Sequence, residues 1–205
     1  MAISKTGIAN LALSRIGEGA IESIDDSGDE VARKIKTVFE HSVRHQSRMS
    51  LWQFLKARAV LTQNATAPAF GYSYSYNLPE DFIRMISVND LDAWDKEDWY
   101  ELESGKLLLD QDSAKIVYVK YIEDTNKYDS LFVEALSVLI ASKLAVIIRQ
   151  DENLSVALLQ EWKQSALPDA VVADGNEQIH RAKKPTLNSE WIASRRWIQR
   201  SPGTF

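Results

Sequence analysis

The sequence predicts an α+β fold that is mainly α: an antiparallel helical bundle with an inserted small β-rich subdomain and an extended C-terminal arm. Three patterns lead to this prediction. Apolar residues recur at helical spacing at the start of the chain and again from Asp129, they alternate between these segments, and they lose any sustained period beyond Asp174. The predicted boundaries are 1–56 and 129–174 for the bundle, 57–128 for the β-rich insertion and 175–205 for the arm.

Two helices are predicted before the insertion. Ser4 or Thr6 can cap a short first helix, which ends in a glycine-rich stretch. A longer helix begins at Ser27, where Glu30 stands at the capping-box position three residues on. Its apolar stripe continues to about Trp52, so an unbroken helix would contain about 28 residues and measure about 40 Å.

Strands are predicted in the middle of the chain, where apolar and polar residues alternate. They comprise RAVLTQ, FGYSYSYNL, FIRMISV, the two halves of DWYELESGKLLLD on either side of Ser104-Gly105, and AKIVYVKYIED. Tyr72, Tyr74 and Tyr76 share one face of the second of these strands. They could stack on sugars or bases. Burial in the sheet or against another subunit is favoured, because the surrounding chain is acidic and repels phosphate.

Helical spacing returns at Asp129. The following segment, Leu131 to Ile148, is apolar on most faces but contains scattered polar residues, which predicts a buried bundle helix and not a membrane span. A short connection over Gln150 to Asn153 predicts an antiparallel helix after it. Pro168 closes or bends that last helix.

The composition of the 205 residues is that of a globular protein, with 45% hydrophobic and 26% charged residues. The absence of cysteine excludes disulfides, thiolate catalysis and cysteine-ligated zinc, and it is compatible with a reducing compartment. The first residues, MAISKTGIANLALSRIGEG, lack the apolar core of a signal peptide. The sequence therefore predicts a soluble intracellular protein.

Candidate chemical sites are weak. His41 and His45 have the spacing of a shared metal site, but no third ligand is identifiable, and a polar helix flank is favoured. The acidic run Asn89 to Asp98 lacks the glycine and closing glutamate of a calcium loop; it reads as a solvated loop that could also pair with a neighbour's arm. No phosphate loop or nucleophile elbow is recognisable, so we expect no enzymatic activity, cofactor or metal.

The C-terminal arm differs in charge from the rest of the chain. From Asn176 to Phe205 there are six basic residues and two acidic ones, a net charge of +4. Because the whole chain has a net charge of −5, the residues before Asn176 carry a net charge of −9. The arm also contains apolar and aromatic residues of the type that anchor protein interfaces. The predicted partner-binding residues are Trp191, Ile192, Arg195, Arg196, Trp197, Ile198 and Arg200. Docking on another chain is favoured over folding back on the bundle, disorder or nucleic-acid binding.

Three stretches together resemble the head-to-tail adaptor proteins of short-tailed bacteriophages, the tail tubular protein A family. ANLALSRIGEGAIESIDDSGDEVARKI, residues 9–35, is similar to that family's opening of short helix, Ile-Gly pair, loop and long helix. SLWQFLKARAVL, residues 50–61, resembles its tryptophan-x-phenylalanine step into the first strand. YNLPEDFIRMISV resembles its turn motif, carried here by Tyr76, Leu78, Pro79, Asp81 and Arg84. The likeness covers residues 2 to about 170.

The resemblance implies a structural virion protein and no enzyme. It implies a ring, usually of twelve copies, that joins the capsid portal to the tail nozzle protein and continues the DNA channel in the neck of the virion. The genomic DNA would pass through during ejection without specific binding, which an acidic wall favours, and no membrane contact is implied. Assembly would take place in the host cytoplasm.

The predicted arm suggests how such a ring forms. Mobile arms order against portal subunits, with Trp191 and Trp197 as anchors and Arg195 and Arg196 paired with carboxylates. The ordering entropy is then lost only at the portal, which discourages premature rings. Two other classes of function stay open. The resemblance to phage tail components implies a tail-associated peptidoglycan hydrolase as one alternative, and the basic arm suggests a DNA-binding assembly protein as the other.

Overall fold

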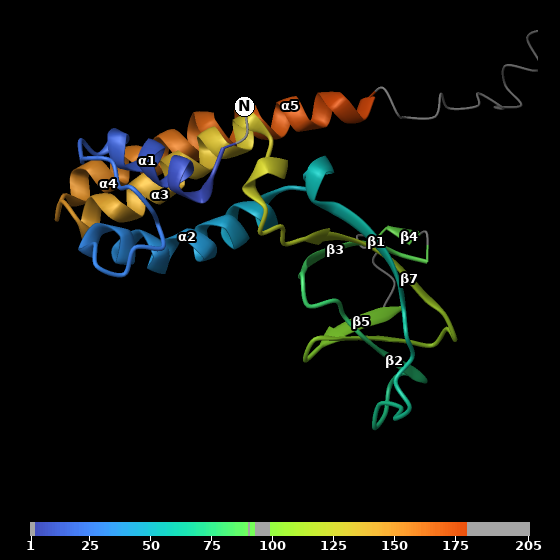
Figure 1. Ribbon diagram of the computed structural model, residues 1–205. Coiled ribbons are helices and arrows are strands. Elements are labelled where there is room, and N and C mark those ends of the chain that lie inside the picture. Colours follow the sequence, from blue (N-terminus) through green and yellow to red (C-terminus); the bar gives the residue numbers. More distant parts are fainter. Residues whose placement is uncertain (1–2, 90, 93–98, 180–205) are drawn as a thin grey trace, which may run out of the picture.

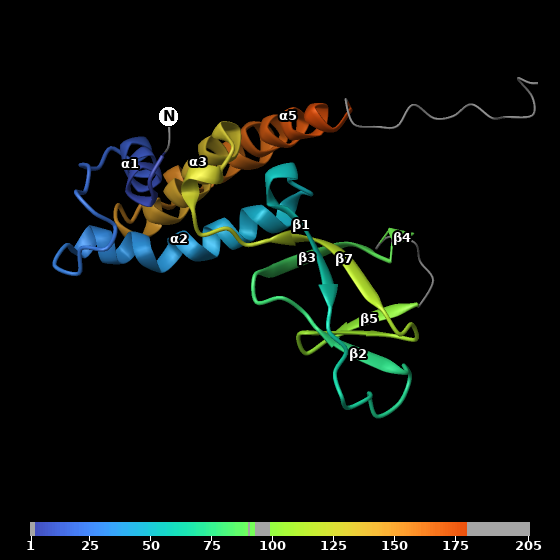
Figure 2. The same ribbon diagram turned by 45° about the vertical axis from the view of Figure 1, so that its right-hand side comes forward.

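The structure, a computed structural model, describes residues 3–89, 91–92 and 99–179. Helices gather at one end of the molecule and strands at the other (Figures 1 and 2). Helices make up 48% and strands 20% of the structure, so the fold is mixed α+β. The predicted mainly α antiparallel bundle with an extended arm is therefore wrong. The strands form two sheets with a hydrophobic core of their own, and a helix continues across residue 175, where the arm was expected to begin.

The first two helices begin at side-chain caps. α1 (Lys5–Arg15) is capped by Ser4, whose Oγ accepts a hydrogen bond from the Gly7 N–H at 3.0 Å. α2 (Glu30–Met49) is capped by Asp29, two residues after the predicted start, and Glu30 is its first helical residue. α2 contains 20 residues rather than the predicted 28, because the chain turns to an extended conformation at Ser50.

The third helix is the centre of the helical part. α3 (Ser130–Ile147) begins at Asp129 as predicted and contacts α1, α2, α4 (Glu152–Glu161) and α5 (Leu167–Ile179). By length and mean hydropathy, 2.0, α3 is apolar enough to cross a membrane, but 67% of it is buried inside the protein. This confirms the predicted buried helix. A π-helical turn, Trp162–Ala166, joins α4 to α5 in one continuous helical segment. Pro168 follows this turn without ending the helix, so the predicted closure at Pro168 is wrong.

Within the described residues, seven short strands form two antiparallel sheets. They are β1 (Lys56–Leu61), β2 (Tyr74–Asn77), β3 (Phe82–Val88), β4 (Leu91–Asp92), β5 (Tyr100–Glu103), β6 (Lys106–Leu109) and β7 (Ala114–Lys120). The strand order is β1-β7-β3-β4 in the first sheet and β2-β6-β5 in the second. The predicted turn at Ser104-Gly105 joins β5 to β6, with positive φ at both residues.

Two hydrophobic cores result. The larger core surrounds α3 and includes Ile83, Ile86 and Val119 from the strands that reach the helices. The second core lies within the β-rich part and contains Tyr76 and Ile116 among its buried residues. Strand β7 serves both cores, because successive side chains of a strand point to opposite faces.

The predicted strand over Phe70 to Leu78 is shorter in the structure, where β2 covers Tyr74–Asn77. Gly71 has φ +89°, and both the N–H and the hydroxyl of Ser73 donate hydrogen bonds to an Asp110 carboxylate oxygen, at 2.8 and 2.9 Å. These contacts bend the chain before β2. The side chain of Phe70 consequently lies in solvent, 89% exposed.

Candidate functional site

All seven predicted partner-binding residues, from Trp191 to Arg200, lie outside the described residues. The described chain ends in α5, so the structure shows the helix from which the predicted arm continues. α5 runs along the helical part and extends on the side where the chain passes to the sheets (Figures 1 and 2). We call the two connecting segments there, residues 50–56 and 121–129, the junction.

An aromatic cluster holds the two segments of the junction together. The ring centroids of Phe54 and Tyr128 are 6.1 Å apart, one from each segment. Phe132, at the start of α3, lies 5.0 Å from the rings of both Trp52 and Phe54 in edge-on arrangements. Edge-to-face pairs of this kind contribute about 0.5–1.5 kcal/mol each beyond their burial. Burial raises the pKa of Tyr128, whose hydroxyl donates a 2.6 Å hydrogen bond to the Ile122 carbonyl.

A buried glutamine joins this cluster to the helices. The Gln46 amide donates a 2.7 Å hydrogen bond to the Phe132 carbonyl and accepts one from the Trp162 indole at 3.2 Å. Its backbone carbonyl accepts a 3.0 Å hydrogen bond from the Trp52 indole. Gln46 is fully buried, so each of these bonds is made away from water. Gln46 of α2 therefore connects three other parts of the chain by hydrogen bonds: α3, the π-helical turn and the junction.

The last helix is tied to the junction by a carboxylate. Asp174 in α5 accepts hydrogen bonds from the backbone N–H of Gln53, at 2.9 Å and 3.2 Å to its two oxygens. Gln53 begins the short 3₁₀ helix Gln53–Leu55, whose first N–H groups have no partner within the helix. A carboxylate at a helix N-terminus also complements the helix dipole. The start of the predicted arm is thus held beside the step from α2 to β1.

The turn-motif residues attach the sheets to the same region. The Asp81 carboxylate accepts a 3.0 Å hydrogen bond from the Tyr118 hydroxyl, and its backbone carbonyl accepts one from the Tyr121 N–H at 2.7 Å. Burial and this carboxylate together raise the pKa of Tyr118 to about 12. Arg84 donates to the Arg48 carbonyl at 3.3 Å, and the Arg48 side chain donates to the Ile83 carbonyl at 2.8 Å.

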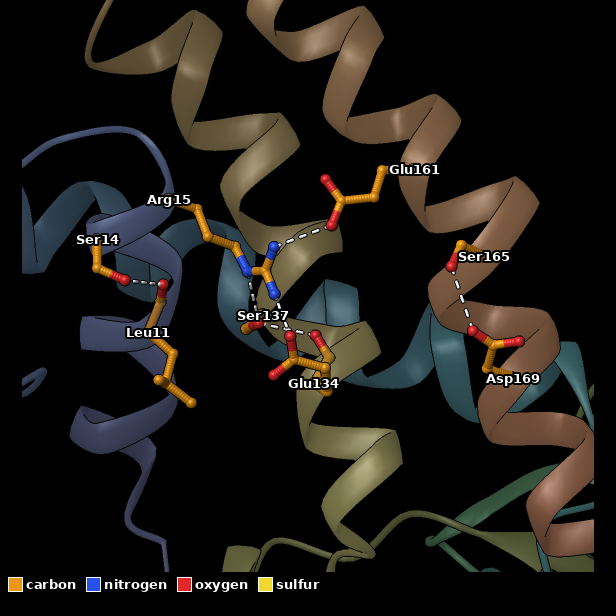
Figure 3. A network of polar contacts seen from close by, with 8 residues as sticks. All are labelled: Leu11, Ser14, Arg15, Glu134, Ser137, Glu161, Ser165 and Asp169. Carbon is orange, nitrogen blue, oxygen red and sulfur yellow. Dashed lines mark hydrogen bonds and ion pairs between the residues drawn. The ribbon is translucent and has the colours of Figure 1, made fainter.

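Arg15 links three helices on the opposite side of the helical part. Its guanidinium donates hydrogen bonds to Ser137 at 3.2 Å and to Glu161 at 3.0 Å, and it forms an ion pair with Glu134 (Figure 3). Glu134 and Ser137 lie on α3 and Glu161 on α4, so one side chain at the end of α1 fixes the spacing of both. Fork geometry lets an arginine serve several acceptors at once. This network is structural, because its groups bind one another.

The histidine pair of α2 does not form a metal site with other described residues. The rings of His41 and His45 are 6.5 Å apart, and no group of three His, Asp or Glu side chains suited to a metal occurs in the described part of the chain. His45 packs instead on the Trp162 ring, at 5.4 Å. Burial, with smaller effects of Lys143 and His41, lowers the pKa of His45.

Lys143 and Ser42 form a pair that the sequence reading did not identify. The Lys143 ammonium donates a 2.8 Å hydrogen bond to the Ser42 hydroxyl, and burial lowers the pKa of this lysine. Ser42 donates in turn to the Val38 carbonyl at 2.7 Å and is completely buried, so no substrate reaches its oxygen. The pair satisfies polar groups between α2 and α3. The sequence feature that could have indicated this pair is that Ser42 and Lys143 each lie within the apolar stripe of a helix.

Two tyrosines of strand β2, Tyr74 and Tyr76, pack in or against the hydrophobic core of the β-rich part. Tyr76 is buried and its hydroxyl donates a 2.7 Å hydrogen bond to the Gln111 carbonyl. Tyr74 packs against the same core at its edge. Burial in the sheet, the favoured prediction, is therefore confirmed for Tyr76. The acidic run Asn89 to Asp98 falls largely outside the described residues.

Neither a protein-family model nor a curated protein matches this sequence. The functional argument therefore rests on the residues and their geometry. Among the residues of the sequence motifs, Trp52 and Phe54 lie within the junction. Asp81 contacts the junction through the Tyr121 N–H, and Arg84 contacts the end of α2 that precedes it. Gln46 lies within the apolar stripe of α2, which indicates its burial, but its partners were not predicted. The contact of Asp174 was missed as well, because hydrogen bonds between remote positions have no periodic signal.

Proposed function

We propose that this chain is the structural subunit of a head-to-tail adaptor ring of a short-tailed bacteriophage. The ring joins the capsid portal to the tail nozzle and continues the DNA channel. The observation that supports the proposal is the shared location of the motif residues. Trp52 and Phe54 pack within the junction, with ring centroids 6.2 Å apart. The Asp81 carbonyl accepts a hydrogen bond from Tyr121 of the junction, and Arg84 ties β3 to the end of α2 next to it.

A connector must keep a fixed distance and angle between the two partners that it joins. The junction supplies this property, because aromatic packing, the Gln46 hub and Asp174 restrain the helices and sheets together. The same restraint sets the position from which residues 180–205 continue. A basic, aromatic segment that starts at a rigid base is suited to docking on an acidic partner surface.

The test is binding to the portal protein of the same virus. The full chain mixed with assembled portal should give, in electron micrographs, an added ring coaxial with the portal. A variant that ends at Ile179 keeps α5 and should stay folded by circular dichroism, yet it should not bind. Failure of the full chain to bind portal under conditions where both proteins are folded would refute the proposal.

Point variants sharpen this test. Trp191→Ala with Trp197→Ala should weaken portal binding by at least about thirtyfold, as expected for two interface anchors worth about 2 kcal/mol or more in total. The matched control is Lys183→Ala with Lys184→Ala, which removes charge from the same segment but no anchor and should cost less than about tenfold. Equal effects of the two double variants would contradict the anchoring role of the indoles.

A further inference from the structure

Two strands of the β-rich part end their sheets without a neighbour on one side. β1 is the first strand of its sheet and pairs with β7, and β5 is the last strand of the other sheet and pairs with β6. Within the part of the chain that the structure describes, the backbone of Lys56–Leu61 makes no ladder beyond β7, nor does Glu101–Glu103 beyond β6. Both strands thus present edge N–H and C=O groups that can pair with another strand.

The two edges carry opposite charge. β1 bears Lys56 and Arg58 on one face, and Lys115 of β7 lies across from Val60 on that same face. β5 bears Glu101 and Glu103 on one face. None of these five residues forms an ion pair with another described side chain. Lys56, Arg58 and Glu101 have apolar residues opposite them within their sheets, whereas Glu103 lies opposite Lys106 of β6.

Charged residues on an edge strand also serve to prevent unwanted pairing, and lysine is common there for that reason. The two edges differ from edges that only prevent pairing, because each of them also exposes an apolar side chain to solvent. Val60 on β1 is 74% exposed and Leu102 on β5 is 43% exposed. A groove of about 230 Å³ lies over the β1–β7 pair, lined by Arg58, Val60 and Val117 among others. An edge that combines exposed apolar residues with charged side chains outside any ion pair is suited to one partner of opposite charge.

The spacing of the charges matches between the edges. In an antiparallel pair with Lys56 opposite Glu103, Ala57 lies opposite Leu102 and Arg58 opposite Glu101. Both ion pairs then fall on one face and the apolar pair on the other, because side chains alternate along each strand. Directly opposed side chains on antiparallel strands have Cβ atoms about 4.5–5.5 Å apart, within reach of ion pairing.

The two edges cannot satisfy each other within one copy. After β1 the chain joins β2, through a bridge between Gln63 and Tyr76 and a 2.8 Å hydrogen bond from the Asn64 N–H to the Ser75 carbonyl. β2 and β6 therefore lie between β1 and β5 of the same molecule. The complementary partner for each edge is the other edge of a second copy.

From this arrangement we infer that β1 of one copy pairs antiparallel with β5 of the next copy, through Lys56–Glu103 and Arg58–Glu101. The contact is heterologous: every copy offers one basic and one acidic edge, so copies add head to tail until a ring closes. The inference deepens the proposed function and rests on it, since it supplies the subunit contact of the proposed ring. A short contact of this kind gains strength by repetition around the ring.

Charge reversal tests the pairing. Lys56→Glu with Arg58→Glu makes both edges acidic, and Glu101→Lys with Glu103→Lys makes both basic. Each double variant alone should self-associate at least about tenfold more weakly than the wild type in sedimentation velocity. An equimolar mixture of the two should assemble, and the fourfold variant, whose edges have exchanged charge, should assemble alone. The matched control, Arg33→Glu with Lys163→Glu, changes the net charge equally away from both edges and should behave as the wild type.

A disulfide trap tests the register. The chain has no cysteine, so Ala57→Cys with Leu102→Cys introduces the two thiols that the register places opposite each other. Mild oxidation of the folded protein should give a ladder of covalent oligomers, whereas Ala57→Cys with Leu108→Cys should not. A wild type that is monomeric at every concentration and yields no trapped ladder would overturn the inference. So would assembly that charge reversal leaves unchanged.

Portal binding separates this inference from the proposed function. If the charge-reversal variants assemble as the wild type does and the full chain binds portal, the edge pairing is overturned and the adaptor function stands. The reciprocal assembly pattern without portal binding supports the edge pairing and refutes the adaptor function. Retardation of DNA by the wild type that is lost on reversal of Lys56 and Arg58, with no self-association, would assign the basic edge to nucleic acid and overturn the inference.

Discussion

Replacing Gln46 with methionine keeps the length of a buried side chain and removes its amide. The wild-type amide bonds the Trp162 indole and the Phe132 carbonyl, and the Gln46 backbone carbonyl separately accepts from Trp52. The substitution leaves the backbone bond in place. It therefore isolates the contribution of the amide to the junction from that of the surrounding aromatic packing.

The magnitude follows from what each former partner retains. The Trp162 indole, 2% exposed, loses its acceptor without access to water, which costs about 1–3 kcal/mol. The Phe132 carbonyl stands in the first turn of α3 and keeps its intrahelical bond, so its loss is the net value of one hydrogen bond, about 0.5–1.5 kcal/mol. The apolar methionine offsets part of this sum. We expect the free energy of unfolding to fall by about 2–3 kcal/mol.

Urea unfolding followed by far-ultraviolet circular dichroism measures this change through the midpoint, with the slope m unchanged. Gln164→Met is the matched control, because Gln164 is exposed, and it should change stability by less than about 0.5 kcal/mol. In a double-mutant cycle, Trp162→Phe should cost about 1 kcal/mol less when Gln46 is already methionine. A loss below about 0.5 kcal/mol for Gln46→Met, or additive effects in the cycle, would refute the role of this hub.

Three further substitutions test local features. Asp29→Ala removes the cap of α2 and should lower the free energy of unfolding by about 1 kcal/mol in urea unfolding. Gly17→Ala should cost about 1 kcal/mol, because Gly17 has φ +72° with no atom near the added methyl; Gly19→Ala, without a positive φ, should cost less, and equal costs would contradict the strain argument. His45→Gln should flatten the acid side of the stability profile. The lowered pKa of His45 means that the unfolded chain binds the proton first, so wild-type stability falls as pH drops below the ordinary value of 6.5; an unchanged profile would contradict this.

Elements with strong local signals were predicted well from the sequence. FIRMISV forms β3 over the same seven residues, and Asp129 begins α3, because alternation and a capping carboxylate are readable in one stretch of chain. The end of α2 was not predicted. Its apolar stripe continues to Trp52, and the chain leaves the helix at Ser50 because Trp52 finds its place among aromatic rings from a distant segment.

The fold class failed for a related reason. Periodicity identified the individual helices and strands, but it could not show that the strands enclose a core of their own around Tyr76 and Ile116. It also placed the start of the arm at residue 175, because no sustained periodicity is recognisable beyond Asp174. The hydrogen bonds between Asp174 and Gln53, 121 positions apart, hold the chain where α5 continues to Ile179.

The candidate site was likewise predicted only in part: some of its residues were identified from the sequence, but their contacts were not. The motif residues Trp52, Phe54 and Asp81 were identified from the sequence by their order along the chain. The sequence could not show that Trp52 and Phe54 pack on Phe132, or that Asp81 contacts the junction through Tyr121. Nor could it show which partners Gln46 binds, because hydrogen bonds between distant positions leave no periodic trace. The charges of β1 and β5 are visible in the sequence, whereas their position at open edges depends on strand order.

The sequence by itself determined the short-range features of this protein: the caps at Ser4 and Asp129, the turn at Ser104-Gly105, and the basic composition beyond Asn176. These depend on contacts within a few residues, whose free energies are set by neighbouring side chains. The tertiary structure alone decided where α2 stops, which polar groups are buried, and which strands lie at an edge. Those outcomes depend on burial against segments that are remote in the chain, and burial is a property of the folded arrangement.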